Sequence, residues 1–154
     1  MIRARRALVI AVAAAAAAPL LAGCEKPAPG VSVWSGTTSI NREALCWTAD
    51  AAAASATSCA EDVVQKALSG DRVPTLNAVA GSTLGISVDT VVASTGWYPT
   101  INGQRLTQDA LHDTYYRLTF PQAAQRQNYT LAVIAGQGST TRGLWAFKLD
   151  VSAG

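Results

Sequence analysis

Apolar and polar residues alternate along several short stretches of this chain, and this period of two most limits how it can fold. The segment Leu84–Val88 reads LGISV, and the segment Leu144–Val151 reads LWAFKLDV. Successive side chains of a β-strand point to opposite faces, so each stretch can set one face on a core and the other in water. The pattern therefore predicts an all-β fold.

Strand signals recur at short intervals, with turn residues between them. Asn102-Gly103 predicts a two-residue hairpin, because both central positions of that turn need a positive φ. Seven or eight short strands in a chain of 154 residues favour an immunoglobulin-like antiparallel β-sandwich. Strands seldom alternate with long helices, which counts against a parallel α/β fold. The expected strands are Val31–Ser35, Ala44–Thr48, Thr75–Val79, Leu84–Val88, Trp97–Ile101, Thr114–Phe120, Tyr129–Ala135 and Leu144–Val151.

One short helical insertion is expected between the second and third of these strands. The segment Ala51–Leu68 is rich in alanine, which has the best intrinsic helix propensity. Within it, Val64 and Leu68 lie one helical turn apart and Gly70 follows, as is typical of a helix end. We expect a short helix over Glu61–Leu68.

The first residues have the plan of an export signal. Arg3, Arg5 and Arg6 precede an apolar run of 16 residues, Ala7–Ala22, and small residues surround its end. A helix that spans a bilayer needs roughly 18–20 apolar residues, so a permanent membrane span is the weaker interpretation. We expect a signal peptide over residues 1–23.

Leu21-Ala22-Gly23-Cys24 resembles the lipobox of bacterial lipoproteins at all four positions. The resemblance implies lipidation of the Cys24 sulfur, cleavage before Cys24 and acylation of the new amine, whereas an ordinary secretory signal is the alternative. Residues 24–30 (CEKPAPG) then form a flexible tether, and residues 31–154 form a single domain. The expected location is the outer face of the cytoplasmic membrane, with the acylated Cys24 in the lipid.

With Cys24 lipidated, Cys46 and Cys59 remain as an even pair in an exported chain, which favours a disulfide. The alternative is two free or metal-binding thiols. Zinc needs about four protein or solvent ligands, and His112 is the sole histidine. No metal site and no cofactor are therefore expected.

No catalytic residue is expected either. His112 could join a serine-type triad only with Asp109 or Asp113, and neighbours so close in sequence seldom orient an imidazole correctly. The loop Gly136–Gly143 lacks the GK[ST] ending of a phosphate loop and leads into a strand, so a hairpin is expected there. The sequence leaves open paired carboxylates among its ten acidic residues.

Charge disfavours a nucleic-acid partner. Three of the twelve basic residues lie in the leader, and the nine that remain stand against ten acidic residues. A nucleic-acid-binding domain needs a basic face. The four tryptophans are expected to lie in the core, and an exposed contact patch at Trp97 with the adjacent Tyr98 is the alternative.

Several short segments together resemble a family of actinobacterial lipoproteins, the domain of unknown function 2771. The resemblance implies an immunoglobulin-like sandwich on the outer side of the membrane and supplies no catalytic residue; the Ala51–Leu68 insertion is longer than the family would have. Besides the lipobox, the segments are Val31–Gly36, Leu45-Cys46-Trp47, Gly81–Asp89, Gly96-Trp97 and Leu118-Thr119-Phe120-Pro121.

The sequence thus predicts a membrane-anchored envelope lipoprotein with a non-enzymatic binding module. Its expected partner is an envelope protein or a wall polymer, with the ligand left open. The alternative is a lipid-anchored hydrolase that acts on cell-wall material through dispersed carboxylates.

Overall fold

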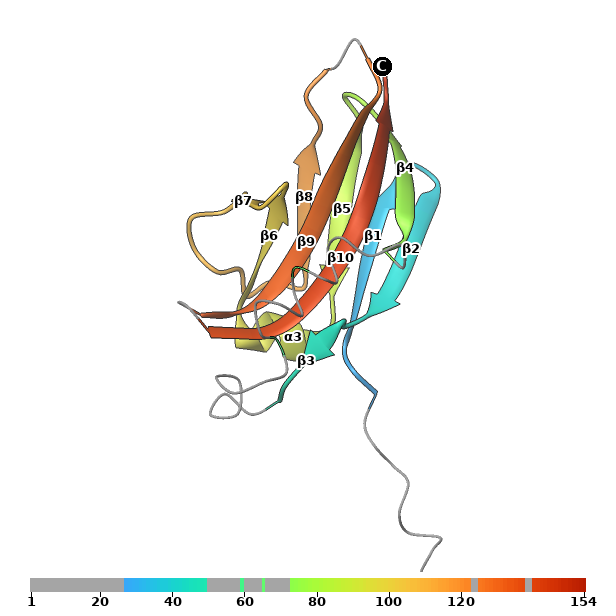
Figure 1. Cartoon of the computed structure of the whole chain (residues 1–154). Coiled ribbons are helices and arrows are strands. Elements are labelled where there is room, and N and C mark those ends of the chain that lie inside the picture. Colours follow the sequence, from blue (N-terminus) through green and yellow to red (C-terminus); the bar gives the residue numbers. More distant parts are fainter. Residues whose placement is uncertain (1–26, 50–58, 60–64, 66–72, 123–124, 138–139) are drawn as a thin grey trace, which may run out of the picture.

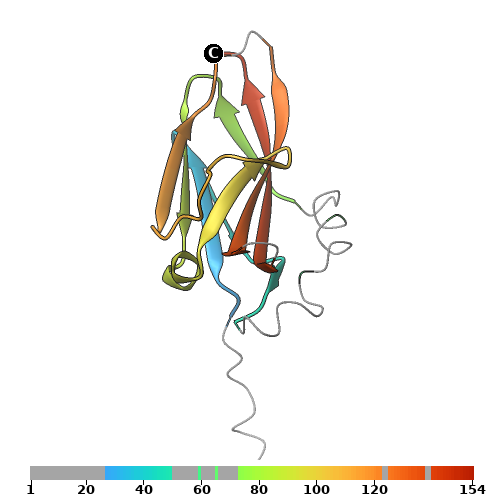
Figure 2. The same cartoon turned by 90° about the vertical axis from the view of Figure 1, so that its left-hand side faces the viewer.

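The computed structural model describes residues 27–49, 59, 65, 73–122, 125–137 and 140–154. Within them, ten strands form two sheets that pack face to face (Figures 1 and 2). The four-stranded sheet has the order β2-β1-β5-β8, with bounds Thr38–Glu43, Gly30–Ser35, Thr83–Val88 and Tyr115–Thr119.

The six-stranded sheet has the order β3-β10-β9-β6-β7, and β4 also pairs with β10. The bounds are Cys46–Trp47 for β3, Thr75–Val79 for β4, Trp97–Ile101 for β6, Gln104–Arg105 for β7, Gln127–Gln137 for β9 and Thr140–Ser152 for β10. The architecture is the all-β, immunoglobulin-like sandwich that the alternation predicted. The described strands pair antiparallel as predicted, except that β4 runs parallel to β10.

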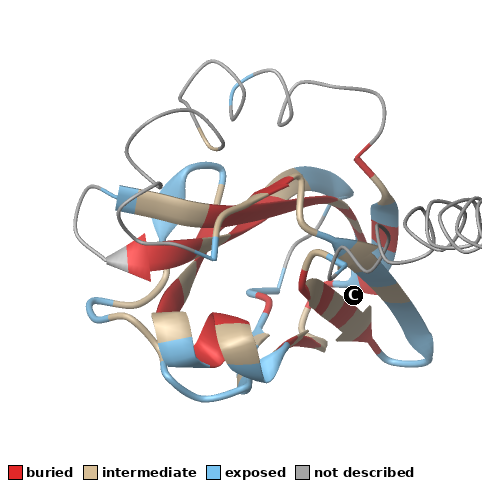
Figure 3. Cartoon of the chain, turned by 90° about the horizontal axis from the view of Figure 1, so that it is seen from below, coloured by how far each residue is buried: buried red, intermediate tan, exposed pale blue. Residues whose placement is uncertain are grey.

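The core lies between the two sheets and is formed by the inward half of each alternating strand. Figure 3 shows these buried residues, which include part of the helix α3 (Thr90–Thr95) at the same end of the sandwich as β3. Removing each such side chain from water contributes roughly 1.5–3 kcal/mol to folding. The largest fully buried side chains are Trp97, Trp145, Phe147, Leu76, Leu84, Ile86, Leu131, Leu144, Leu149, Val31, Val33 and Val92.

Eight strands lie where they were expected, with small shifts of their ends. The Asn102-Gly103 turn is also confirmed: it joins β6 to β7, and its two residues have φ values of 50° and 79°. The sequence did not predict β2, β7 or α3. The expected helical insertion at Ala51–Leu68 falls almost wholly outside the described residues.

The domain begins earlier than Val31. Pro29 is buried, and its carbonyl accepts hydrogen bonds from Trp145 Nε1 (2.9 Å) and from the Ala44 amide (3.2 Å). Gly30 is already the first residue of β1. The end of the expected tether is therefore part of the fold.

The chain enters the sandwich at the end where β3 and α3 lie, and its C-terminus lies at the opposite end (Figure 1). The broad outer faces of both sheets thus run along the flanks between these two ends. Among the described residues, no helix has the length and apolar character needed to cross a membrane.

Candidate functional site

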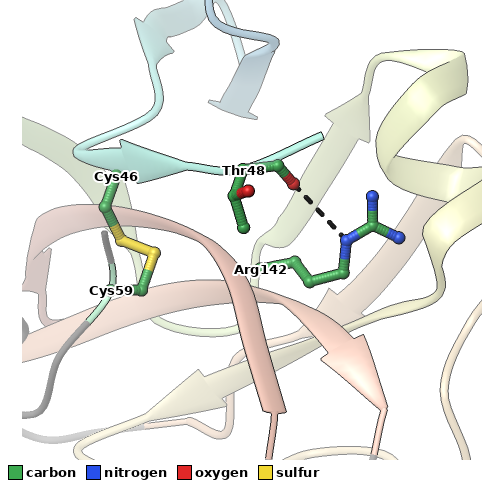
Figure 4. The surroundings of a disulfide bond; sticks show 4 residues. All are labelled: Cys46, Thr48, Cys59 and Arg142. Atoms are coloured by element: carbon green, nitrogen blue, oxygen red, sulfur yellow. Dashed lines mark hydrogen bonds between the residues drawn. A yellow bond between two sulfur atoms is a disulfide. The ribbon is translucent and has the colours of Figure 1, made fainter. Parts of the chain in front are cut away.

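The outer face of the six-stranded sheet is closed at one corner by a disulfide. Cys46 and Cys59 are bonded, with their Cα atoms 5.5 Å apart, so the predicted pairing is confirmed (Figure 4). Cys46 packs with Ala132 and Leu144 in a second apolar cluster, separate from the main core. Cys59 is partly buried and packs against this cluster. This corner is therefore structural.

Arg142 on β10 completes the same corner. Its Nε donates to the Thr48 carbonyl at 3.4 Å (Figure 4). Its guanidinium carbon lies 5.8 Å from the centre of the Trp47 ring. The ring centre of Trp47 in turn lies 5.9 Å from that of Trp145. A β-carbon on Gly143 would come within 2.6 Å of Trp47 and 2.8 Å of Trp145, so glycine is needed for this packing.

The alternative of an exposed contact patch at Trp97 and Tyr98 does not hold for Trp97, and core burial of this tryptophan is confirmed. Trp97 is fully buried, and its Nε1 donates to the Asp113 carbonyl at 2.8 Å. Tyr98 is partly exposed, but the Arg105 guanidinium covers its ring at 3.9 Å. Alternation along β6 explains why the two neighbours differ in burial, because it turns Trp97 into the core and Tyr98 outward.

The residues considered for chemistry are dispersed. His112 is exposed, and its Nδ1 lies 3.2 Å from the Ala93 carbonyl. Among the described residues, no group of three or more His, Cys, Asp or Glu side chains could hold a metal ion. The Gly136–Gly143 stretch is a hairpin connection, since Gln137 at the end of β9 pairs with Thr140 at the start of β10.

Two open hollows lie on the described surface. One, of about 510 Å³, is lined by residues 87–91 and by Thr114, and Asp89 is the single carboxylate in that lining. The other, of about 340 Å³, lies at the end of the sandwich around Ser35, Asn77 and Ser82, and its described lining contains no carboxylate. Neither hollow brings two acidic side chains together.

The outer face of the four-stranded sheet presents a different surface. Residues paired directly across strands share a face, so the register defines two neighbouring rows on this side. One row contains Ser39, Trp34, Gly85 and Arg117, and the next contains Asn41, Ser32, Ser87 and Tyr115. We call these eight residues the aromatic face.

Trp34 and Tyr115 are the large side chains of the aromatic face. Their ring planes lie within 14° of parallel, and the ring centres are 6.4 Å apart. Tyr115 is 41% exposed, and Trp34 is partly exposed. A β-carbon on Gly85 would collide with the indole of Trp34, so the indole lies directly over the glycine.

Sequence reasoning missed this pair, although the alternation contained the signal. Val31 and Val33 point into the core, which places Trp34 on the opposite face of β1. The same argument places Tyr115 opposite Tyr116 on β8. Residue type alone drew attention to the wrong tryptophan.

The two charged groups with the clearest mutual effect lie away from the aromatic face. The Arg126 guanidinium hydrogen-bonds the Asp150 carboxylate on β10 and thereby lowers the pKa of Asp150. The same contact raises the pKa of Arg126. This ion pair joins β10 to the residue preceding β9, so its role is local.

Comparison with known proteins yields a fold neighbour of low similarity. No family model and no curated protein sequence matches the chain. Among solved structures, it is similar to the fibronectin(III)-like modules of Clostridium thermocellum CbhA, with 16% identity and a TM-score of 0.39. That match covers 52% of this chain and 88% of the other.

Proposed function

We propose that this protein is an envelope lipoprotein that presents a non-enzymatic binding module on the outer face of the cytoplasmic membrane. The observation that supports binding best is the aromatic pair on the outer face of the four-stranded sheet, where Tyr115 is exposed and Trp34 is partly exposed. Aromatic side chains anchor contacts because they offer a large area and have few torsions to fix. The ligand binds along a flank of the sandwich.

The proposed anchor is the acylated Cys24 that follows the lipobox. Each buried methylene contributes about 0.8 kcal/mol, and two or more acyl chains are needed for stable attachment. The disulfide between Cys46 and Cys59 supports export, because such bonds persist in oxidising compartments. The chain enters the fold at one end of the sandwich, and the aromatic face lies along a flank rather than at that end.

The test of anchoring is the Cys24→Ala variant, expressed in a bacterial host with an alkyne-tagged fatty acid. We expect the wild-type chain to carry the label and to sediment with membranes. The variant should lose the label and remain uncleaved or be released, because the sulfur that accepts the lipid is gone.

The matched control is the double variant Cys46→Ala/Cys59→Ala, which removes the other two thiols and should keep the label. Labelling of Cys24→Ala at the wild-type level would contradict the proposed anchor.

A further inference from the structure

We infer that the aromatic face is a binding platform for a neutral polysaccharide chain. This inference deepens the proposed function, on which it relies for the envelope location, by naming the chemical class of the ligand. It depends on three features of the face: its shape, its polar groups and its charge.

The shape matches a sugar ring. Gly85 lets the indole of Trp34 lie down on the sheet, and the Tyr115 ring is parallel to it within 14°. A pyranose ring has one side lined by C–H groups, whose slight positive charge is attracted to the negative face of an aromatic ring. Ring centres 6.4 Å apart let a single chain contact both aromatic groups.

The polar groups around the rings match hydroxyl groups of a ligand. Asn41 Nδ2 donates to Ser32 Oγ at 2.8 Å, which fixes both groups beside Trp34. Thr83 and Thr119 pair across β5 and β8 and extend the same side of the sheet. Serine, threonine and asparagine side chains both donate and accept hydrogen bonds, as sugar hydroxyls do. The hydroxyl side chains on this side are Ser32, Ser39, Thr83, Ser87 and Thr119.

The charge of this side of the sheet favours a neutral ligand. Arg117 lies on the edge strand β8, and Glu43 lies on the other edge strand, β2. One charge of each sign at opposite edges leaves the middle uncharged. A nucleic acid or another polyanion would need a stripe of basic residues.

A peptide fits this surface less well than a glycan does. Peptides that bind sheets usually add a strand at an open edge or insert side chains into pockets. Trp34 lies on β1 and Gly85 on β5, the two inner strands of this sheet. Neither hollow described above is formed by the aromatic pair. A flat surface with hydrogen-bonding groups beside two rings therefore favours a chain of sugar units.

The test is native affinity electrophoresis of the full chain carrying Cys24→Ala, so that lipidation does not affect the result. Separate gels contain hydroxyethyl cellulose, glycogen or arabinogalactan as neutral probes, and polygalacturonate as an anionic probe. We expect at least one neutral polysaccharide to retard the protein. Trp34→Ala and Tyr115→Ala should each weaken that retardation about tenfold or more, as central aromatic anchors do.

Tyr98→Ala is the matched control, because it removes a partly exposed aromatic ring from the other sheet and should bind as the parent does. Gly85→Ala keeps both rings but displaces the indole, and it should also weaken binding. Tyr115 is on an edge strand and 41% exposed, so its variant should fold even if Trp34→Ala does not; thermal unfolding checks each variant.

Several outcomes would overturn the platform: no retardation in any neutral gel, retardation by polygalacturonate alone, or equal binding by the parent and Tyr115→Ala. The two proposals fail separately. Retardation without fatty-acid labelling of the wild-type chain would refute the anchor and support the platform. Labelling without retardation would support the anchor and refute the platform.

Discussion

The outer face of the six-stranded sheet carries a small apolar cluster that includes Cys46 of the Cys46–Cys59 disulfide, whereas the outer face of the four-stranded sheet carries Trp34 and Tyr115. Both sheets set a tryptophan on a glycine: Trp47 with Gly143 on the core side of the six-stranded sheet, and Trp34 with Gly85 on the outer face of the four-stranded sheet. The difference lies in what surrounds the indole.

On the core side, the Trp47 ring packs against the indole of the buried Trp145 and lies near the Arg142 guanidinium, so it is part of the core packing. On the outer face, Trp34 is stacked with Tyr115, and its neighbours across the strands are Ser39 and Gly85. The pairing of a tryptophan with a glycine thus fills part of the core at one sheet and forms part of the outer surface at the other.

The largest expected effect distinguishes a core indole from a surface indole. Trp145→Ala should reduce the free energy of unfolding by about 3–5 kcal/mol, because it leaves a cavity in the main core. It also leaves the Pro29 carbonyl without its indole donor. Trp34→Ala should cost about 1 kcal/mol or less, since solvent fills the space. Denaturant unfolding of both variants measures the difference, and equal losses would show that Trp34 serves the core.

The next effect concerns the Cys46–Cys59 disulfide on the outer face of the six-stranded sheet. Replacing Cys46 and Cys59 with alanine should reduce the free energy of unfolding by about 3 kcal/mol, because the disulfide closes a loop of 13 residues. Wild-type protein in reducing buffer should unfold at nearly the same denaturant concentration as the variant. Glycan retardation through Trp34 should be unchanged, since the disulfide lies on the other sheet. Loss of that retardation in the folded variant would contradict independence of the two faces.

Much of the core followed from the alternation of apolar residues, because strand geometry and burial are both local consequences of a period of two. The strand β2 was missed because Ile40 is its sole aliphatic residue and the strand lies at an edge. The helix α3 was missed because Val91 and Val92 have low helix propensity. Burial of Val92 and Ala93, and a glycine with φ of 87° at Gly96, override that preference.

The candidate site was predictable only in part. Alternation could have shown that Trp34 and Tyr115 point away from the core, but not that they meet. Their contact depends on the register between β1, β5 and β8, which pairs Trp34 with Gly85 and Ser87 with Tyr115. Register arises from pairing between distant segments, as does the parallel contact of β4 with β10. Residue type and spacing do not specify either pairing.

The smallest expected effect tests the ion pair on the six-stranded sheet. The hydrogen bond and charge of Arg126 lower the pKa of Asp150 in the folded state, so the pair stabilises the fold above the pKa that Asp150 has when unfolded. This stabilisation is lost as pH falls through the lower, folded pKa. Because the Arg126 side chain is 69% exposed, solvent and salt screen the contact. Asp150→Asn should therefore lower Tm slightly at neutral pH and low salt, and the difference from wild type should vanish in strong acid or at high salt.

Asp109→Asn is the control for the loss of one exposed carboxylate outside this pair. A Tm difference for Asp150→Asn that persists unchanged in acid would show that it comes from packing on β10, not from charge.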